Sequence, residues 1–186
     1  ENSQLLIRNI NINPTRVGII KILKMMGGSI KFLNKRSYKG EKISDIFIKS
    51  SKNLKAINCP VKYNSSAIDE FLVIFLVAAR SRGTSYFKDL SELDQKESPR
   101  LKWASKILKF MGINNKLTKS SIKIVGNPNL ELKKKIGIKN FSKDHRVFMM
   151  SVIAALTCGG KWKRKDLDSS KTSYPQFLEL LNKIEY

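Results

Sequence analysis

Three short charged clusters in this sequence carry the residue types that acid–base chemistry and anion binding need. They are IDEF at residues 68–71, KESPR at 96–100 and DHR at 144–146. Apolar residues at helical spacing follow the clusters, so each cluster is expected at the N-terminus of a helix. Free N–H groups and the helix dipole favour anions at that end, and adjacent Lys or Arg side chains can hold a phosphate or a carboxylate.

The residues alone leave each cluster with a plainer interpretation. Asp69 stands before a run of apolar residues, where the helix dipole alone would favour it, although partial desolvation would also suit a general base. KESPR is either a solvated helix start capped by Ser98 or an anion clamp formed by Lys96 and Arg100. His145 is the only histidine, and no further His or Cys stands at useful spacing, so no metal site is predicted.

The elements that must position these clusters are arranged as an internal repeat. KILKMMG at 21–27 and KILKFMG at 106–112 are nearly the same peptide, and residues 68–83 resemble residues 144–160. Strand patterns stand between these helices, which predicts an α/β (α+β) domain built from pseudo-symmetric repeats. Equivalent helix starts in such a repeat tend to lie along one edge. The three clusters are therefore expected to converge on one anionic ligand.

Glycine, proline and asparagine mark the expected boundaries of the elements. The first helix is expected to begin at Asn13-Pro14 and to end at Gly27-Gly28, and later helices are expected from Ser98 and from Tyr174. Strands are expected at QLLIRNI (4–10), SIKFL (29–33), ISDIFIKS (43–50), TSYFKDL (84–90), SIKIVG (121–126) and KWKR (161–164).

Composition bounds the size of the core and the class of partner. The chain has 186 residues, of which 41% are hydrophobic, and 36 Lys and Arg oppose 15 Asp and Glu for a net charge of +21. Such a charge predicts attraction to polyanions, but it also fits a solvated, lysine-coated surface. Two cysteines without a CxxC pair indicate neither a disulfide framework nor a zinc site, which favours a reducing, cytoplasmic location.

Two further features indicate whether the chain could span a membrane and whether it belongs to a longer protein. The longest apolar run, at residues 71–79, is far shorter than the roughly 20 residues that span a bilayer, so no membrane partner is expected. The sequence begins with Glu1 and has no signal-peptide pattern. We therefore expect it to be part of a longer protein.

Taken together, the motifs resemble the second half of EPSP synthase, the 3-phosphoshikimate 1-carboxyvinyltransferase family. The opening LLIRNININPTRVGIIKILKMMGGSI is similar to the strand, Asn-Pro-Thr-Arg turn and helix of that family. IDEF, KES.R, DHR and SYPQF then follow in the family's order. The similarity covers essentially the whole chain, and the four motifs together are specific.

This resemblance implies a two-domain enzyme in which each domain holds three βαβαββ units. Residues 1–186 would be its C-terminal domain, with the N-terminal part of the enzyme missing. The implied reaction moves the enolpyruvyl group of phosphoenolpyruvate onto the 5-hydroxyl of shikimate 3-phosphate and releases phosphate. The resemblance also implies no metal or organic cofactor, a monomer when complete, no specific nucleic-acid partner, and no turnover by the fragment alone.

The resemblance assigns roles to individual residues. Asp69 matches the carboxylate that takes the 5-hydroxyl proton, and Glu97 matches the acid–base group that serves the methylene carbon of phosphoenolpyruvate. Lys96 matches a contact to shikimate 3-phosphate. Arg100 and Arg146 match the guanidinium pair that holds the phosphoenolpyruvate anion.

The chain departs from the family pattern at three places. Pro99 replaces the usual Asp before Arg100, and Asp94-Gln95 replaces an Arg-Val pair. The lysine that some members carry before the Ser/Thr-aromatic-Pro motif is Thr172 here, and Lys171 is the candidate substitute for substrate binding.

Two alternatives stay open at this point. The sister transferase that acts on UDP-N-acetylglucosamine shares the repeat, although KES and DHR favour EPSP synthase. A catalytically inactive basic domain that binds nucleic acid would account for the charge of +21 and for Pro99. It lacks an RNP motif, a zinc finger and an aromatic-interleaved basic stripe.

Overall fold

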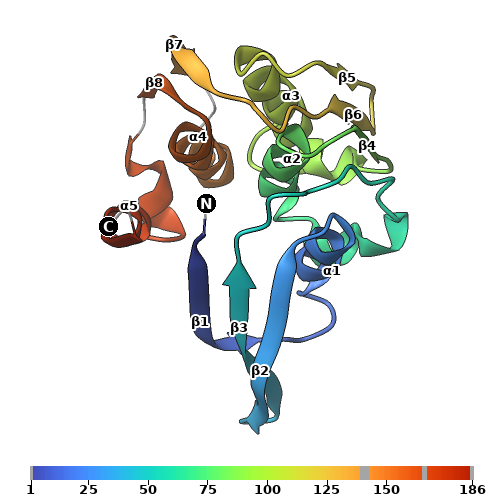
Figure 1. The fold of residues 1–186 in the computed structure, drawn as a ribbon, viewed down its shortest axis with the longest axis vertical. Coiled ribbons are helices and arrows are strands. Elements are labelled where there is room, and N and C mark those ends of the chain that lie inside the picture. Colours follow the sequence, from blue (N-terminus) through green and yellow to red (C-terminus); the bar gives the residue numbers. More distant parts are fainter. Residues whose placement is uncertain (1, 139–142, 165–166, 185–186) are drawn as a thin grey trace.

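The computed structural model describes residues 2–138, 143–164 and 167–184. Helices and strands alternate along the chain (Figure 1). In chain order they are β1 (Gln4–Asn11), α1 (Gly18–Met25), β2 (Ser29–Tyr38), β3 (Glu41–Lys49), α2 (Phe71–Ala79), β4 (Thr84–Phe87), α3 (Arg100–Phe110), β5 (Asn115–Leu117), β6 (Ile122–Val125), β7 (Leu132–Ile138), α4 (His145–Cys158), β8 (Gly159–Arg164) and α5 (Phe177–Ile184). Short 3-10 helices cover Val61–Tyr63, Ser65–Ala67, Ser91–Gln95 and Leu167–Thr172.

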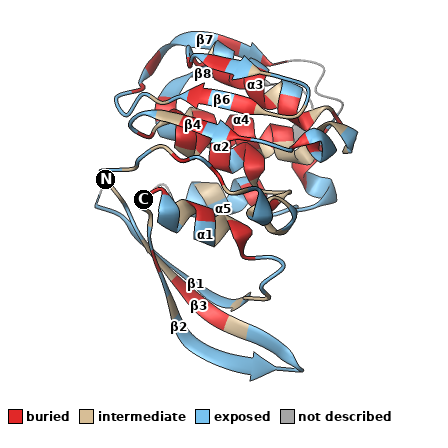
Figure 2. Ribbon diagram, turned by 90° about the vertical axis from the view of Figure 1, so that its right-hand side faces the viewer, coloured by how far each residue is buried: buried red, intermediate tan, exposed pale blue. Residues whose placement is uncertain are grey.

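The first three strands form an antiparallel sheet in the order β1-β3-β2, which extends away from the rest of the molecule (Figures 1 and 2). The strands predicted at SIKFL and ISDIFIKS are confirmed as the antiparallel pair β2 and β3, although β2 runs five residues further than SIKFL. Both outer strands shift register opposite the same part of β3. There Asp45 accepts hydrogen bonds from the Asn9 amide at 2.9 Å and the Asn34 side chain at 2.8 Å. The Asp45 carboxylate therefore holds both strands in place where their register shifts, as at a β-bulge.

The body of the molecule contains an antiparallel sheet, β4-β6-β5, and a parallel pair, β7-β8. Parallel strands need a crossover connection, and two helices supply it. α4 connects β7 to β8. α2 connects two segments that pair in parallel through bridges between Lys55 and Arg82 and between Asn58 and Tyr86. α2 and α4 pack against each other inside the body (Figure 2).

The core is centred on α2, which is apolar on all sides. Phe71, Ile74 and Phe75 have no exposed surface. The rings of Phe71 and Phe75 meet the ring of Phe87 on β4 edge to face, at centroid distances of 6.1 and 5.0 Å. A helix that is hydrophobic all round must be buried, so the start of α2 is held rigidly at the edge of this core.

Several expected boundaries are confirmed, and three expected helix starts are wrong. α1 and α3 both end before glycines with positive φ, +93° at Gly27 and +81° at Gly112. α1 begins at Gly18 rather than at Asn13-Pro14, because the Asn13 side chain accepts hydrogen bonds from the amide and hydroxyl of Thr15 and forms a turn instead. α3 begins at Arg100 rather than at Ser98, and α5 begins at Phe177 rather than at Tyr174.

These findings confirm a mixed α/β fold, while the βαβαββ repeat stays a prediction. Cys59 and Cys158 are both buried free thiols. Within the described residues, no helix combines the length and the apolar character that crossing a membrane requires.

Candidate active site

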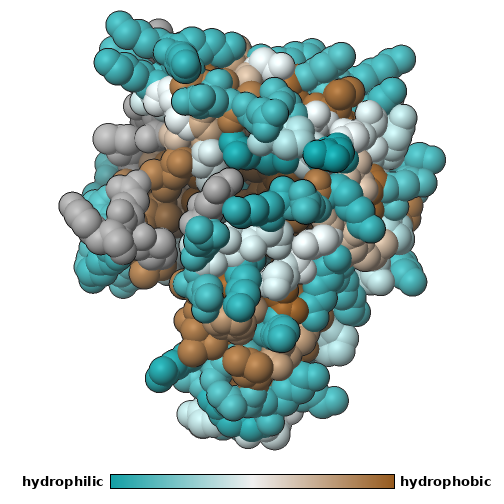
Figure 3. Space-filling view, in the orientation of Figure 1, coloured by the Kyte–Doolittle hydropathy of each residue, from teal (hydrophilic) through white to brown (hydrophobic). Residues whose placement is uncertain are grey.

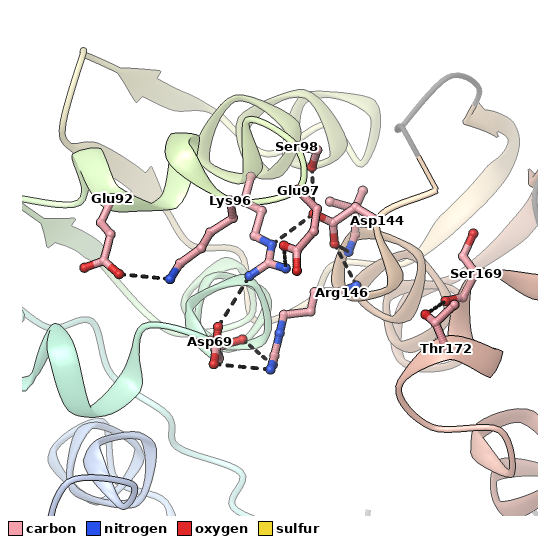
Figure 4. Close-up of polar contacts among 11 residues, drawn as sticks. Asp69, Glu92, Lys96, Glu97, Ser98, Asp144, Arg146, Ser169 and Thr172 are labelled. Carbon is pink, nitrogen blue, oxygen red and sulfur yellow. Dashed lines mark hydrogen bonds and ion pairs between the residues drawn. The ribbon is translucent and has the colours of Figure 1, made fainter.

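The three charged clusters lie together, as the sequence predicts. Asp69 stands two residues before the first residue of α2, Arg100 is the first residue of α3, and Arg146 is the second residue of α4. Figure 4 shows the side chains of Asp69, Glu97, Asp144 and Arg146 directed toward one another. The expected convergence of three helix starts is confirmed.

Arg100 is the centre of this cluster. Its guanidinium group is buried, with 2% of the side chain exposed. Nε donates to Asp144 Oδ2 at 3.0 Å, Nη1 lies 3.4 Å from Asp69 Oδ1, and Nη2 pairs with the carboxylate of Glu97. Burial of a charge is unfavourable unless it is paired and hydrogen-bonded. Three carboxylates meet that requirement, so one guanidinium connects the starts of all three helices.

Asp144 has no assigned role in the sequence prediction, yet it joins two of the helix starts. Its Oδ1 atom accepts from the amides of Arg146 at 2.9 Å and Val147 at 3.3 Å, which caps α4. Its Oδ2 atom accepts from Ser98 Oγ at 2.8 Å and from Arg100. Burial of the Asp144 carboxyl raises its pKa, but the hydrogen bonds from Ser98 and Arg100 outweigh burial and hold the pKa below its ordinary value.

Arg146 is the more accessible guanidinium of the cluster, with 32% of its side chain exposed. Nη2 lies 3.3 Å from Asp69 Oδ2, and Nη1 donates to the backbone carbonyl of Asp69 at 2.8 Å. A guanidinium group has five N–H donors, so several remain for a ligand. Burial raises the pKa of the neighbouring Glu70; the Arg146 charge opposes this rise, and the Asp69 charge adds to it.

The other predicted site residues lie at different distances from this centre. Glu97 is 57% exposed and pairs with Arg100 from the solvent side. Lys96 lies on the rim, where its Nζ atom is 2.9 Å from Glu92. Lys171 is 70% exposed and pairs with Asp168 at 2.7 Å, an interaction that lowers the Asp168 pKa. Figure 4 shows the adjacent Thr172 bonded to Ser169, apart from the cluster.

The sequence left the start of the KESPR helix either capped by Ser98 or open to an anion through its free amides, and the structure shows neither arrangement. The Asp94 carboxylate accepts from the amides of Leu101 at 2.9 Å and Lys102 at 3.3 Å, so a residue of the chain occupies the start of α3. Ser98 does not cap this helix either, because its hydroxyl donates to Asp144. The departure from Arg-Val to Asp94-Gln95 thus supplies a helix cap. Anion binding at the cluster depends on side chains instead.

The acidic side chains of the cluster are arranged around arginine rather than around a cation site. Among the residues that the structure describes, no group of three or more His, Cys, Asp or Glu side chains is placed to hold a metal ion. His145, the first residue of α4, is half-buried beside Arg146. The arrangement can bind an anion at Arg146 and present two carboxylates, Asp69 and Glu97, for proton transfer.

Comparison with known proteins places the chain in a family. The family model described as EPSP synthase (3-phosphoshikimate 1-carboxyvinyltransferase) matches residues 1–181. A 3-phosphoshikimate 1-carboxyvinyltransferase of Ruthia magnifica subsp. Calyptogena magnifica is 40% identical over 182 residues, which are 98% of this chain and 41% of the relative. The enzyme of Thermodesulfovibrio yellowstonii is 37% identical over 185 residues, 99% of this chain and 42% of the relative.

Solved structures agree with these relatives. The EPSP synthase of Acinetobacter baumannii superposes with a TM-score of 0.84 at 33% identity, over 98% of this chain and 42% of that one. The enolpyruvyl transferase NikO of Streptomyces tendae shares the fold, with a TM-score of 0.68 at 15% identity over 97% of this chain and 38% of that one. The chain spans about two-fifths of the length of the relatives it matches. It belongs to the EPSP synthase family.

Proposed function

We propose that the full-length protein containing this chain transfers the enolpyruvyl group of phosphoenolpyruvate to the 5-hydroxyl of shikimate 3-phosphate, and that residues 1–186 are its C-terminal domain. The observation that carries the proposal is the meeting of three helix starts, which gathers Asp69, Glu97, Arg100 and Arg146 in one cluster. The names of the curated relatives favour shikimate 3-phosphate over UDP-N-acetylglucosamine as the acceptor.

The proposed mechanism uses the two carboxylates for proton transfer. Asp69 accepts the proton of the 5-hydroxyl while that oxygen bonds to the phosphate-bearing carbon of phosphoenolpyruvate, and Glu97 supplies a proton to the methylene carbon. The product of this step is a tetrahedral intermediate with a new methyl group. Loss of one methyl proton to Glu97 and departure of phosphate then restore the double bond in the product.

The two arginines have different roles in this proposal. Arg146 binds the phosphoenolpyruvate anion directly, because its guanidinium group is partly exposed. The resemblance assigns Arg100 to the same anion, but its side chain is only 2% exposed and pairs with Asp69, Glu97 and Asp144, so we propose instead that it holds these carboxylates in place. The substrate anion competes with Asp69 for Arg146, so binding frees the carboxylate that must accept a proton. Fork geometry and a permanent charge make arginine suitable for both tasks.

Lys96 and Lys171 are proposed as further contacts to the substrates. Lys96 directly precedes Glu97 and would become available to shikimate 3-phosphate once it leaves Glu92. Lys171 lies on Leu167–Thr172 beyond α4 and would require movement of that segment. That the complete protein is a cytoplasmic monomer without a cofactor stays a prediction.

Exposed apolar side chains support the proposal that the chain is part of a larger protein. Leu5 and Ile7 on β1 and Leu156 on α4 are exposed. Figure 3 shows apolar surface over the three-stranded sheet as well as in the body. Exposed apolar patches often mark interaction surfaces, and we propose that the rest of the protein covers part of this surface.

Phosphate release by the full-length protein tests the proposal. We expect release from phosphoenolpyruvate that depends on shikimate 3-phosphate, and no release with UDP-N-acetylglucosamine as acceptor. The 186-residue chain alone should release no phosphate with either acceptor. Activity with UDP-N-acetylglucosamine alone would contradict the substrate assignment, and turnover by the isolated chain would contradict the two-domain proposal.

A further inference from the structure

A cationic surface lies beyond the C-terminal end of α2, whereas Asp69 and the candidate active site lie at its N-terminal end. Two adjoining hollows there measure about 320 and 280 Å³ and share Lys52, Leu54 and Pro128 in their walls. Asn53, Lys55 and Arg82 complete the first hollow, and Ser50, Ser51, Arg80 and Asn129 complete the second. Every lining residue named for these two hollows is neutral or cationic, and their volumes suit a small ligand.

Lys55 and Arg82 contribute positive charge to the wall of the first hollow. They are direct partners in a parallel β-bridge, so their side chains leave the backbone on the same side. Hydrogen bonds of 2.9 Å, from the Arg82 amide to Leu54 and from the Ala56 amide to Arg82, hold the two segments together. Like charges directly opposite each other destabilise a strand pair. An anion bound between the two side chains would remove that repulsion.

The second hollow contributes an anchored guanidinium group. Arg80 Nη1 donates to the carbonyl of Leu130 at 2.6 Å and to the carbonyl of Thr157 at 3.2 Å. These bonds fix the guanidinium plane at the end of α4. Ser51 Oγ accepts from the Ser29 amide at 3.0 Å, which leaves its hydroxyl hydrogen able to donate to a ligand.

We propose that this surface is a binding site for the phosphate group of a small anionic ligand, separate from the proposed active site. The phosphate lies between Lys55 and Arg82, and the remainder of the ligand extends along the wall that Arg80 and Ser51 form. α2 has nine residues and is therefore about 13 Å long at about 1.5 Å per residue. The ligand site and Asp69 lie beyond opposite ends of it.

A second cation pair on the same protein provides a control. Lys116 and Lys123 are direct partners between the antiparallel strands β5 and β6, so they also place two positive charges side by side, although Lys55 and Arg82 are paired in parallel. The hollow beside them measures only about 90 Å³. A general attraction of anions to a basic surface would affect both pairs equally, whereas a site with room for a ligand would distinguish them.

The test is calorimetric titration of the full-length protein with inorganic phosphate and with pyrophosphate, at constant ionic strength. An Arg146→Ala background removes the proposed phosphoenolpyruvate contact of the active site. We expect saturable one-to-one binding that weakens at least tenfold in Lys55→Ala/Arg82→Ala and less than twofold in Lys116→Ala/Lys123→Ala. Unchanged thermal midpoints establish that both variants are folded.

Three results would overturn the proposal. Equal weakening in the two double variants would indicate general charge attraction, and the absence of saturable binding would indicate that no site exists. Tighter binding of a single-stranded oligonucleotide than of pyrophosphate, lost equally in both variants, would indicate a nucleic-acid surface instead. Stronger binding of pyrophosphate than of inorganic phosphate would support a phosphorylated metabolite as the ligand, and the reverse would support free phosphate.

Discussion

Replacement of Asp144 by alanine removes two kinds of interaction at once. The cap on α4 is lost, which costs about 1 kcal/mol of stability in typical helices. The Arg100 guanidinium group, only 2% exposed, also loses the partner of its Nε atom. Removal of one member of a buried ion pair costs about 3–5 kcal/mol. Because Asp69 and Glu97 still face Arg100, we expect the low end, and a total loss of about 4 kcal/mol.

Urea denaturation at neutral pH, followed by tryptophan fluorescence, measures this loss in the full-length protein. Trp103 lies on α3, three residues after Arg100, and reports on this part of the chain. Asp144→Asn is the matched control, because its side-chain oxygen can still accept one hydrogen bond while the charge is gone. We expect its loss to be about half as large. A loss below about 1 kcal/mol for Asp144→Ala, near the mean for ordinary substitutions, would refute the reasoning.

The pH dependence of stability provides an independent check on Asp144. Its pKa is lowered in the folded protein, so the stability it contributes is present above the unfolded-state pKa of about 3.9 and is lost as pH falls through the lower folded-state value. We expect the wild-type protein to lose stability in that acidic window. Asp144→Asn should show a flatter profile there, and an identical profile would contradict the assignment.

The remaining predictions concern catalysis, packing and thiol reactivity. Glu97→Gln in the full-length protein should lower kcat by about 100-fold or more, because a proton donor is removed; a near-normal kcat would exclude that role. Gly126→Ala should destabilise the fold by more than about 3 kcal/mol, since a Cβ atom there would lie 2.1 Å from a backbone oxygen, whereas Gly137→Ala, which has nothing within 4 Å, should stay within about 1 kcal/mol. Urea denaturation compares the two variants, and equal losses would contradict the packing argument. Burial raises the pKa of Cys59 to about 11, so it should react with a thiol reagent at pH 8 only on unfolding, and fast labelling of the native protein would contradict this.

The sequence pattern was sufficient to predict where the helices of the site begin. A carboxylate before an apolar run marks the starts of α2 and α4, and glycine marks the ends of α1 and α3. These signals are local, because capping and positive φ depend on a few neighbouring residues. The prediction for Asn13-Pro14 failed because a side-chain turn at Asn13 competes with the helix.

The partners within the cluster could not be read from the sequence, because they depend on tertiary packing. Nothing local indicates that Asp94 caps α3 from six residues before Arg100, or that Ser98 donates to Asp144 across 46 positions. The burial of Arg100 is likewise a property of three helices together. The N-cap position of Asp144 was the one available signal for its structural role.

Deuterium exchange at the methylene carbon of phosphoenolpyruvate tests the central proposal most directly. In heavy water with shikimate 3-phosphate present, the full-length wild-type protein should introduce deuterium there, because protonation by the Glu97 carboxyl is reversible. Mass spectrometry should detect this exchange in the wild type and its loss in Glu97→Gln. No exchange by the wild type, or exchange at the same rate in the variant, would contradict the enolpyruvyl mechanism at this cluster.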